Sequence, residues 1–192
     1  MKVLKNILSV IGGVVILGIA FAFFKFDLGT RIEQATDLDP KAMGLYMMMA
    51  DDVLTTGDSA KAMIRRVKVD KDVDIEDVVE TLNSVATEKN LLVVASSLMS
   101  GGSKGGKYIR IISYCNPHIA KQFIEHSMAY SAFMPCRVAI IEDDNGDYWL
   151  YTMDLGLMIA GGHTLPPKLL KQAKYIESTM YEMMDKAAKG DF

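Results

Sequence analysis

The stretch that decides the fold is residues 108–153, with the sequence YIRIISYCNPHIAKQFIEHSMAYSAFMPCRVAIIEDDNGDYWLYTM. Its isoleucines predict a strand at Tyr108–Tyr114. Asn116-Pro117 then predicts the start of a helix, because Asn caps helices and Pro suits their first turn. Further on, Asp144-Asn145-Gly146 is a strong turn signal and predicts a hairpin. Strands and a helix therefore alternate within this stretch.

The sequence on either side extends the same pattern. The hairpin and the flanking segments predict a strand at Met63–Val69, a helix capped by Asp74, a strand at Leu91–Leu98, hairpin strands at Val138–Glu142 and Tyr148–Met153, and an amphipathic helix from Pro166-Pro167 to about Ala188. This order mixes hairpins with helices, which is typical of the α+β class. We therefore expect one mainly antiparallel sheet of about five strands, with helices packed on it.

Composition excludes several kinds of protein. The chain has 192 residues, enough for one domain and an anchor, and half of them are apolar. The net charge of −3 leaves no broad positive field, so we expect no nucleic-acid partner. The two cysteines form no CxxC, so a zinc ribbon and covalent haem are poorly supported. The glycine-rich connection Gly101–Gly106 lacks the order of residues that a phosphate-binding loop needs.

The N-terminal segment predicts a membrane anchor. Asn6–Phe24 carries no charge and is almost entirely apolar, and about 20 such residues cross a bilayer as a helix. Lys2 and Lys5 precede it, so the N-terminus is expected in the cytoplasm. We interpret residues 1–26 as a transmembrane anchor that contacts the bilayer through residues 3–24.

A cleaved signal peptide is the alternative, because Ala20-Phe21-Ala22 has the small-x-small pattern of a cleavage site. Both interpretations place the domain outside the cytoplasm. We therefore expect a single-pass protein of the cytoplasmic (inner) membrane, with its domain on the periplasmic side.

Residues 27–59 are interpreted as a connector and a methionine-rich stalk, followed by the domain at 60–192. The connector is polar, and the stalk helix is expected from Pro40 to Thr56. It contains Met43, Met47, Met48 and Met49. Methionines at helical spacing usually fill cores or form adaptable surfaces, so this helix is a candidate site for a protein partner. Copper(I) binding by thioethers is the alternative.

Cys115-Asn116-Pro117 and Pro135-Cys136-Arg137-Val138 are separated by a short helix and followed by the acidic hairpin turn. This arrangement resembles the bacterial and archaeal domain of unknown function (DUF) family 302, from about Ile64 to the final helix. Arg137 stands where that family usually has Asn. The resemblance implies a compact α+β fold that often self-associates, and so a homo-oligomer, but it implies no known reaction.

Cys115 and Cys136 are the candidate catalytic residues, with Asn116, Pro117, His118 and Arg137 as candidate binding residues. A position beside a helix N-terminus predicts a lowered thiol pKa for Cys115, and hence a reactive cysteine or a redox pair. Two buried apolar side chains or a structural disulfide are the alternatives.

Cys115 and His118 also have a C-x-x-H spacing. With Cys136 they are a candidate three-ligand site for a soft metal or haem iron. His118 as an exposed residue at the helix start is the simpler interpretation.

These observations favour a binding or accessory domain, assisting a membrane-associated redox or sulfur process, over an enzyme. The sequence contains no catalytic set that can be recognised from residue types and spacing, and no evident cofactor site. A thiol redox or sulfur-carrier protein that uses Cys115 and Cys136 is one alternative. Soft-metal or haem binding through Cys115, His118 and a methionine is another.

Overall fold

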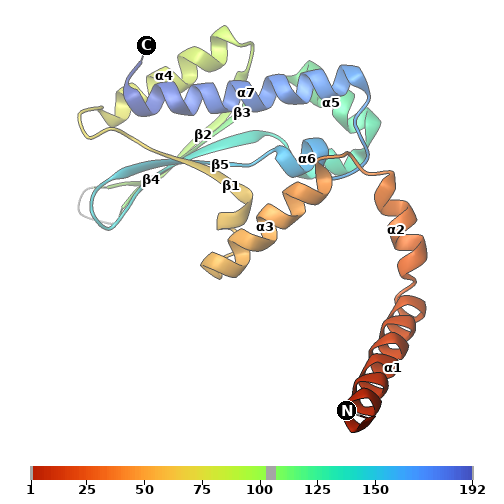
Figure 1. The fold of residues 1–192 in the computed structure, drawn as a ribbon. Coiled ribbons are helices and arrows are strands. Elements are labelled where there is room, and N and C mark those ends of the chain that lie inside the picture. Colours follow the sequence, from red (N-terminus) through yellow and green to blue (C-terminus); the bar gives the residue numbers. More distant parts are fainter. Residues whose placement is uncertain (1, 103–106, 192) are drawn as a thin grey trace.

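A computed structural model describes residues 2–102 and 107–191, with side chains described from residue 11 onward. Within these residues one antiparallel sheet has the strand order β1-β5-β4-β3-β2 (Figure 1). Its strands are Ile64–Lys68 (β1), Leu92–Gly101 (β2), Tyr108–Cys115 (β3), Cys136–Glu142 (β4) and Tyr148–Met153 (β5). The predicted α+β class and five-stranded antiparallel sheet are confirmed. Residues 103–106 of the predicted glycine-rich connection lie outside the described residues.

Two helices, α4 (Ile75–Glu88) and α7 (Pro167–Lys189), lie side by side over one face of the sheet (Figure 1). Asp74 caps α4 as predicted, because its side chain accepts a hydrogen bond from the Glu76 amide at 2.8 Å. The main core forms between these helices and the sheet. Its fully buried side chains include Leu82, Ile112, Val138, Ile140, Leu150, Met180, Met183 and Met184.

The β4–β5 hairpin is closed by a turn that Asp143 organises. Its carboxylate accepts hydrogen bonds from the amides of Asn145 at 2.8 Å and Asp147 at 3.0 Å, and from the Trp149 indole at 3.0 Å. The hydrogen bond from the Trp149 indole is the main reason that the pKa of Asp143 lies below its usual value. Gly146 has a φ of +77°, which an L side chain rarely adopts. Asp143–Asp147 therefore forms the turn that the sequence predicts.

A second, smaller core lies at the end of the sheet. Three short elements build it, namely α5 (Pro117–His126), the 3₁₀ helix η2 (Met128–Phe133) and α6 (Gly156–Ala160), together with the start of α7. Helix α6 has only five residues, too few for a helical period to show in the sequence, and it was not predicted. This second core positions the candidate site described below.

The predicted stalk helix, α3 (Ala42–Thr56), packs against the domain instead of standing apart from it (Figure 1). The Tyr46 hydroxyl donates a hydrogen bond to the Gly161 carbonyl at 2.8 Å, and Ala42 is buried. The predicted polar connector also differs from the structure, since it contains a helix, α2 (Leu28–Thr36). None of the residues of α2 is buried, and none belongs to either hydrophobic core.

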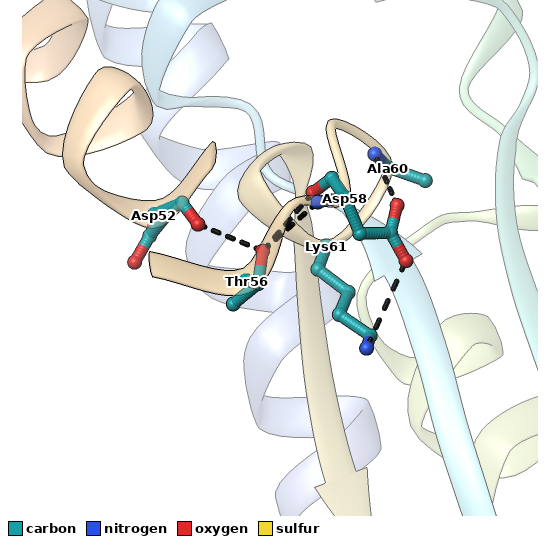
Figure 2. A network of polar contacts seen from close by, with 5 residues as sticks. All are labelled: Asp52, Thr56, Asp58, Ala60 and Lys61. Atoms are coloured by element: carbon teal, nitrogen blue, oxygen red, sulfur yellow. Dashed lines mark hydrogen bonds and ion pairs between the residues drawn. The ribbon is translucent and has the colours of Figure 1, made fainter. Parts of the chain in front are cut away.

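A polar network ends α3 and turns the chain toward β1 (Figure 2). The Thr56 hydroxyl donates to the Asp52 carbonyl at 2.7 Å and accepts from the Asp58 amide at 3.2 Å. Asp58 in turn accepts from the Ala60 amide at 2.9 Å and pairs with Lys61 at 3.8 Å. A 3₁₀ helix, η1 (Lys61–Met63), then leads directly into β1. The end of the methionine-rich helix is therefore held close to the edge of the sheet.

The N-terminal helix, α1 (Lys2–Lys25), extends away from the domain (Figure 1). Among the residues whose side chains are described, no single helix is long and apolar enough to cross a bilayer. Ile11–Lys25 and Leu28–Thr36 meet that test as a pair bent by 66°, on length and composition alone.

Candidate functional site

The two cysteines lie on neighbouring strands at the end of the sheet next to the second core. Cys115 is the last residue of β3 and Cys136 is the first residue of β4. Tyr114 is the direct cross-strand partner of Cys136, so Cys115 lies one residue beyond that pair. Both cysteines are partly buried, and both are free thiols in the described chain. The fold thus brings together two residues that are 21 positions apart in the sequence.

Asn116 fixes the backbone that follows Cys115. Its side-chain oxygen accepts a hydrogen bond from the Ile119 amide at 3.0 Å, so it caps α5 as predicted. Its side-chain nitrogen donates to the Asn90 carbonyl at 3.0 Å. The first bond ties the end of β3 to α5, and the second ties it to the loop that precedes β2. The backbone that follows Cys115 is therefore held by hydrogen bonds to α5 and to the loop before β2.

Both thiols line one small apolar cavity of about 70 Å³, which we call the cysteine cavity. The side chains around it come from β3, α5, η2, α6 and α7 and from the segment that precedes β4. Within the described chain, its wall contains no Asp, Glu, Lys, Arg or His. The lining residues include Cys115, Asn116, Ala120, Phe123, Tyr130, Phe133, Met134, Cys136, Leu155, Met158 and Ala173.

Burial keeps both thiols protonated at neutral pH. It raises the pKa of Cys115, and it raises the pKa of Cys136 to about 11, with the neighbouring Cys115 adding to the shift. The predicted lowering of the Cys115 pKa is therefore wrong. Asn116, the capping residue, lies between Cys115 and the first turn of α5. Its side chain accepts the hydrogen bond from the Ile119 amide, which is one of the free amides at the start of the helix. Desolvation of the Cys115 thiol is therefore the dominant effect on its pKa.

The other predicted residues lie around this cavity in different ways. Asn116 is part of its wall, whereas Pro117 and His118 are exposed on α5 and are not. Arg137 is exposed and lines a separate depression with Cys136. No cluster of three or more His, Cys, Asp or Glu side chains suited to a metal ion occurs among the described residues. The structure therefore does not bring His118 together with the cysteine pair.

A larger cleft of about 600 Å³ opens beside the cysteine cavity, between α3 and α6. We call it the methionine cleft, because its wall includes Met48, Met49, Met63, Met153 and Met158. Tyr130, Phe133 and Met158 belong to the walls of both hollows, so the two adjoin. The Tyr130 hydroxyl donates to the Met158 carbonyl at 3.1 Å, which holds this shared wall together.

The residues that the sequence did not single out are aromatic and methionine side chains in the wall of the cysteine cavity. Phe123 and Tyr130 pack edge to face, with ring centroids 5.2 Å apart. Met134 precedes Cys136 by two positions, and the Met134–Pro135 peptide bond between them is cis. Tyr130 and Met134 lie close to Cys136 in the sequence, and this closeness is the one signal that could have identified them.

Comparison with known proteins agrees with this architecture. Residues 65–187 match the model of the family described as "Domain of unknown function DUF302". The chain belongs to the DUF302 family. A crystal structure of an uncharacterized conserved DUF302 protein from Bacillus stearothermophilus is similar, with a TM-score of 0.51 and 17% sequence identity. The similarity covers 65% of this chain and 98% of the other, and at this identity it supports the fold alone. No curated protein matches the chain.

The family match takes in both cysteines, α5, the hairpin and most of α7. It begins at Arg65, so α1, α2 and α3 precede it. The cysteine cavity is therefore built mainly from the DUF302 domain. The methionine cleft also uses α3, from outside the matched residues.

The raised thiol pKa values predict slow alkylation near neutral pH. With a pKa of about 11, only roughly one Cys136 thiol in 10⁴ is ionised at pH 7, and the thiolate is the reactive form. We expect iodoacetamide to label Cys115 before Cys136, and both more slowly than in the unfolded chain. The labelling rate should rise steadily up to about pH 11, as followed by mass spectrometry.

The chain unfolded in guanidinium chloride is the control for this measurement. Labelling of Cys115 at pH 7 that is faster in the folded chain than in the unfolded chain would contradict the raised pKa. That result would also support the prediction that Cys115 is a reactive nucleophile.

Proposed function

We propose that this DUF302 protein is a membrane-anchored, extracytoplasmic binding or accessory domain that assists a membrane-associated redox or sulfur process. The methionine cleft is the observation that carries the proposal. Its volume of about 600 Å³ is in the range of ligand-binding pockets, and flexible thioether side chains suit a surface that adapts to its partner. The occupant that we propose is an apolar segment of a membrane-associated protein.

The exposure of two of the five cleft methionines supports a binding role for them over core packing. Met48 is 67% exposed and Met63 is 45% exposed, whereas Met180, Met183 and Met184 in the main core are at most 1% exposed. Methionines that filled a core would be covered like the second group. Tyr46 and Asp52 add polar groups at the rim of the cleft, where they can orient a bound segment.

A photo-crosslinker placed in the cleft tests this proposal. With p-benzoylphenylalanine in place of Met48, illumination of native membranes should give one discrete adduct with a membrane redox or sulfur protein. The additional change Ala62→Trp fills the wall of the cleft and should remove the adduct. Ala50→Trp lies on the exposed side of α3 and should leave it unchanged.

The same crosslinker at Met128, which is 82% exposed and lies outside the cleft, gives the background level. An adduct at Met48 that is no stronger than this background, or one that survives Ala62→Trp, would contradict binding in the cleft.

Sequence features support the proposed anchor. The run Asn6–Phe24 is uncharged, and Lys2 and Lys5 precede it, so the positive-inside rule orients the domain outward. Only α2 and short connections separate this run from α3 in the chain, so an anchor here would hold the methionine cleft near the membrane. The domain would then meet its partner at the surface of the bilayer.

Charges placed inside the proposed span test the anchor. Each Arg near the centre of a membrane helix costs about 2.5–3.5 kcal/mol of insertion free energy. We expect Val14→Arg with Leu17→Arg to release the protein from membranes during alkaline carbonate extraction, whereas Leu54→Arg on exposed α3 should not. If alkaline carbonate released the wild-type chain from membranes, the anchor would be ruled out.

A second candidate function is thiol redox chemistry, favoured by the position of Cys115 and Cys136 on adjacent strands around one cavity. Oxidation would join the two sulfurs, release two protons and pass two electrons to an acceptor. The raised pKa values make such exchange slow at neutral pH. The alkylation measurement above therefore also decides between this candidate and a binding role.

We further propose that the protein self-associates through the edge strand β2. This ten-residue strand carries no charge, and its large side chains are exposed, with Leu98 at 54% and Met99 at 69%. Long apolar edges are usually protected by charge or covered by a partner. Two copies of an uncharged strand can pair antiparallel without repulsion, which makes a second copy the occupant that we propose.

Charge on this edge should therefore separate the copies. We expect the full chain to sediment as a dimer and Leu98→Lys to sediment as a monomer, because a buried Lys at the interface lacks a partner. Met128→Lys, on an exposed residue away from the sheet, is the control and should remain dimeric. A wild-type chain that is already monomeric would contradict pairing through β2.

A further inference from the structure

The cysteine cavity gathers four sulfur-bearing side chains from separate parts of the chain. Cys115 ends β3, Cys136 begins β4, Met134 lies two positions before β4, and Met158 lies in α6. The part of the wall that the structure describes offers no carboxylate and no imidazole. The donors available to an ion in this cavity are therefore almost entirely soft.

We propose that the cysteine cavity is a binding site for a monovalent copper ion, held by Cys115 and Cys136 with Met134 and Met158. Thiolates alone suit copper(I), zinc and iron–sulfur clusters, whereas structural zinc sites are built from four Cys or His ligands, so the two thioethers are the donors that favour copper(I). The volume of about 70 Å³ suits a single ion and is too small for a drug-sized ligand. Met158 belongs to the wall that the cavity shares with the methionine cleft, whereas Cys115, Cys136 and Met134 lie outside the cleft, so copper(I) binding can be measured without a docked partner.

Proton balance gives the proposal a signature. Each thiol that binds copper(I) releases its proton to solvent, so two cysteines release two protons and leave a site with one net negative charge. Since protons compete with the metal, copper(I) affinity should rise by ten- to hundredfold per pH unit below the thiol pKa values.

Two neighbouring hollows share wall residues with the cavity. Tyr130, Phe133 and Met158 separate it from the methionine cleft, and the thioethers of that cleft are themselves soft ligands. On the other side, Cys115 and Met134 also line a shallow surface depression. Binding must therefore be assigned to the cavity by variants that distinguish its sulfurs from those of the cleft.

The experiment is an anaerobic titration of the full chain with copper(I), with bicinchoninate as the competing chelator. We expect one tightly bound ion per chain and a thiolate-to-copper absorption band in the ultraviolet. Cys115→Ala with Cys136→Ala should remove the band and weaken binding on the order of a hundredfold or more. Met134→Leu with Met158→Leu keeps apolar volume, removes both thioethers and should weaken binding roughly tenfold.

Matched controls decide where the ion binds. Met48→Leu with Met49→Leu removes thioethers from the cleft alone and should leave the affinity unchanged. Circular dichroism and thermal unfolding identify any variant that does not fold. If the double cysteine variant fails in this way, Cys115→Ala alone and the pH dependence of wild-type affinity carry the test.

Three results would overturn the proposal: the absence of stoichiometric binding, an affinity that does not change with pH, and an affinity that depends on Met48 and Met49 but not on the cysteines. Crosslinking at Met48 is measured independently. A chain that docks its partner but binds no copper(I) would therefore refute the metal site and leave the proposed function standing.

Discussion

The antiparallel pairing of β3 with β4, which places Tyr114 opposite Cys136, is the constraint on which the rest of the site depends. Tyr114 is fully buried, and its hydroxyl donates a hydrogen bond to the Asn83 side chain of α4 at 3.0 Å. The same register pairs Ile112 with Val138 in the main core. A slip of one residue would turn every side chain of β4 to the opposite face, so the core and the cysteine pair are specified together.

Burial, rather than the nearby helix terminus, sets the chemistry of the two thiols. A helix N-terminus lowers a thiol pKa when its free amides point at the sulfur, but here Asn116 accepts the hydrogen bond from the Ile119 amide. The surrounding wall is apolar and lacks charged side chains in the described chain, so desolvation prevails. Neutral, partly buried thiols suit a binding site better than a nucleophile at neutral pH.

The docking of α3 decides whether its methionines form a free surface or one wall of a cleft. Local signals describe the helix well, since it ends at Thr56 as predicted and the following Gly57 adopts a φ of +68°. The hydrogen bond from Tyr46 to Gly161 joins residues 115 positions apart, and no periodic pattern encodes it. Helix α6, which contributes Leu157 and Met158 to the opposite wall, is too short for a pattern to reveal it.

The sequence by itself determined the α+β class, the order of the five strands with α3, α4, α5 and α7 along the chain, the cap at Asn116 and the hairpin turn. These features depend on side-chain periodicity and on hydrogen bonds between near neighbours, which are local properties. Only the tertiary structure decided that Cys115 and Cys136 share a cavity with Met134 and Met158, that His118 lies outside it, and that the thiol pKa values rise. Those properties depend on which distant side chains exclude water from the sulfurs, and that exclusion is a consequence of packing.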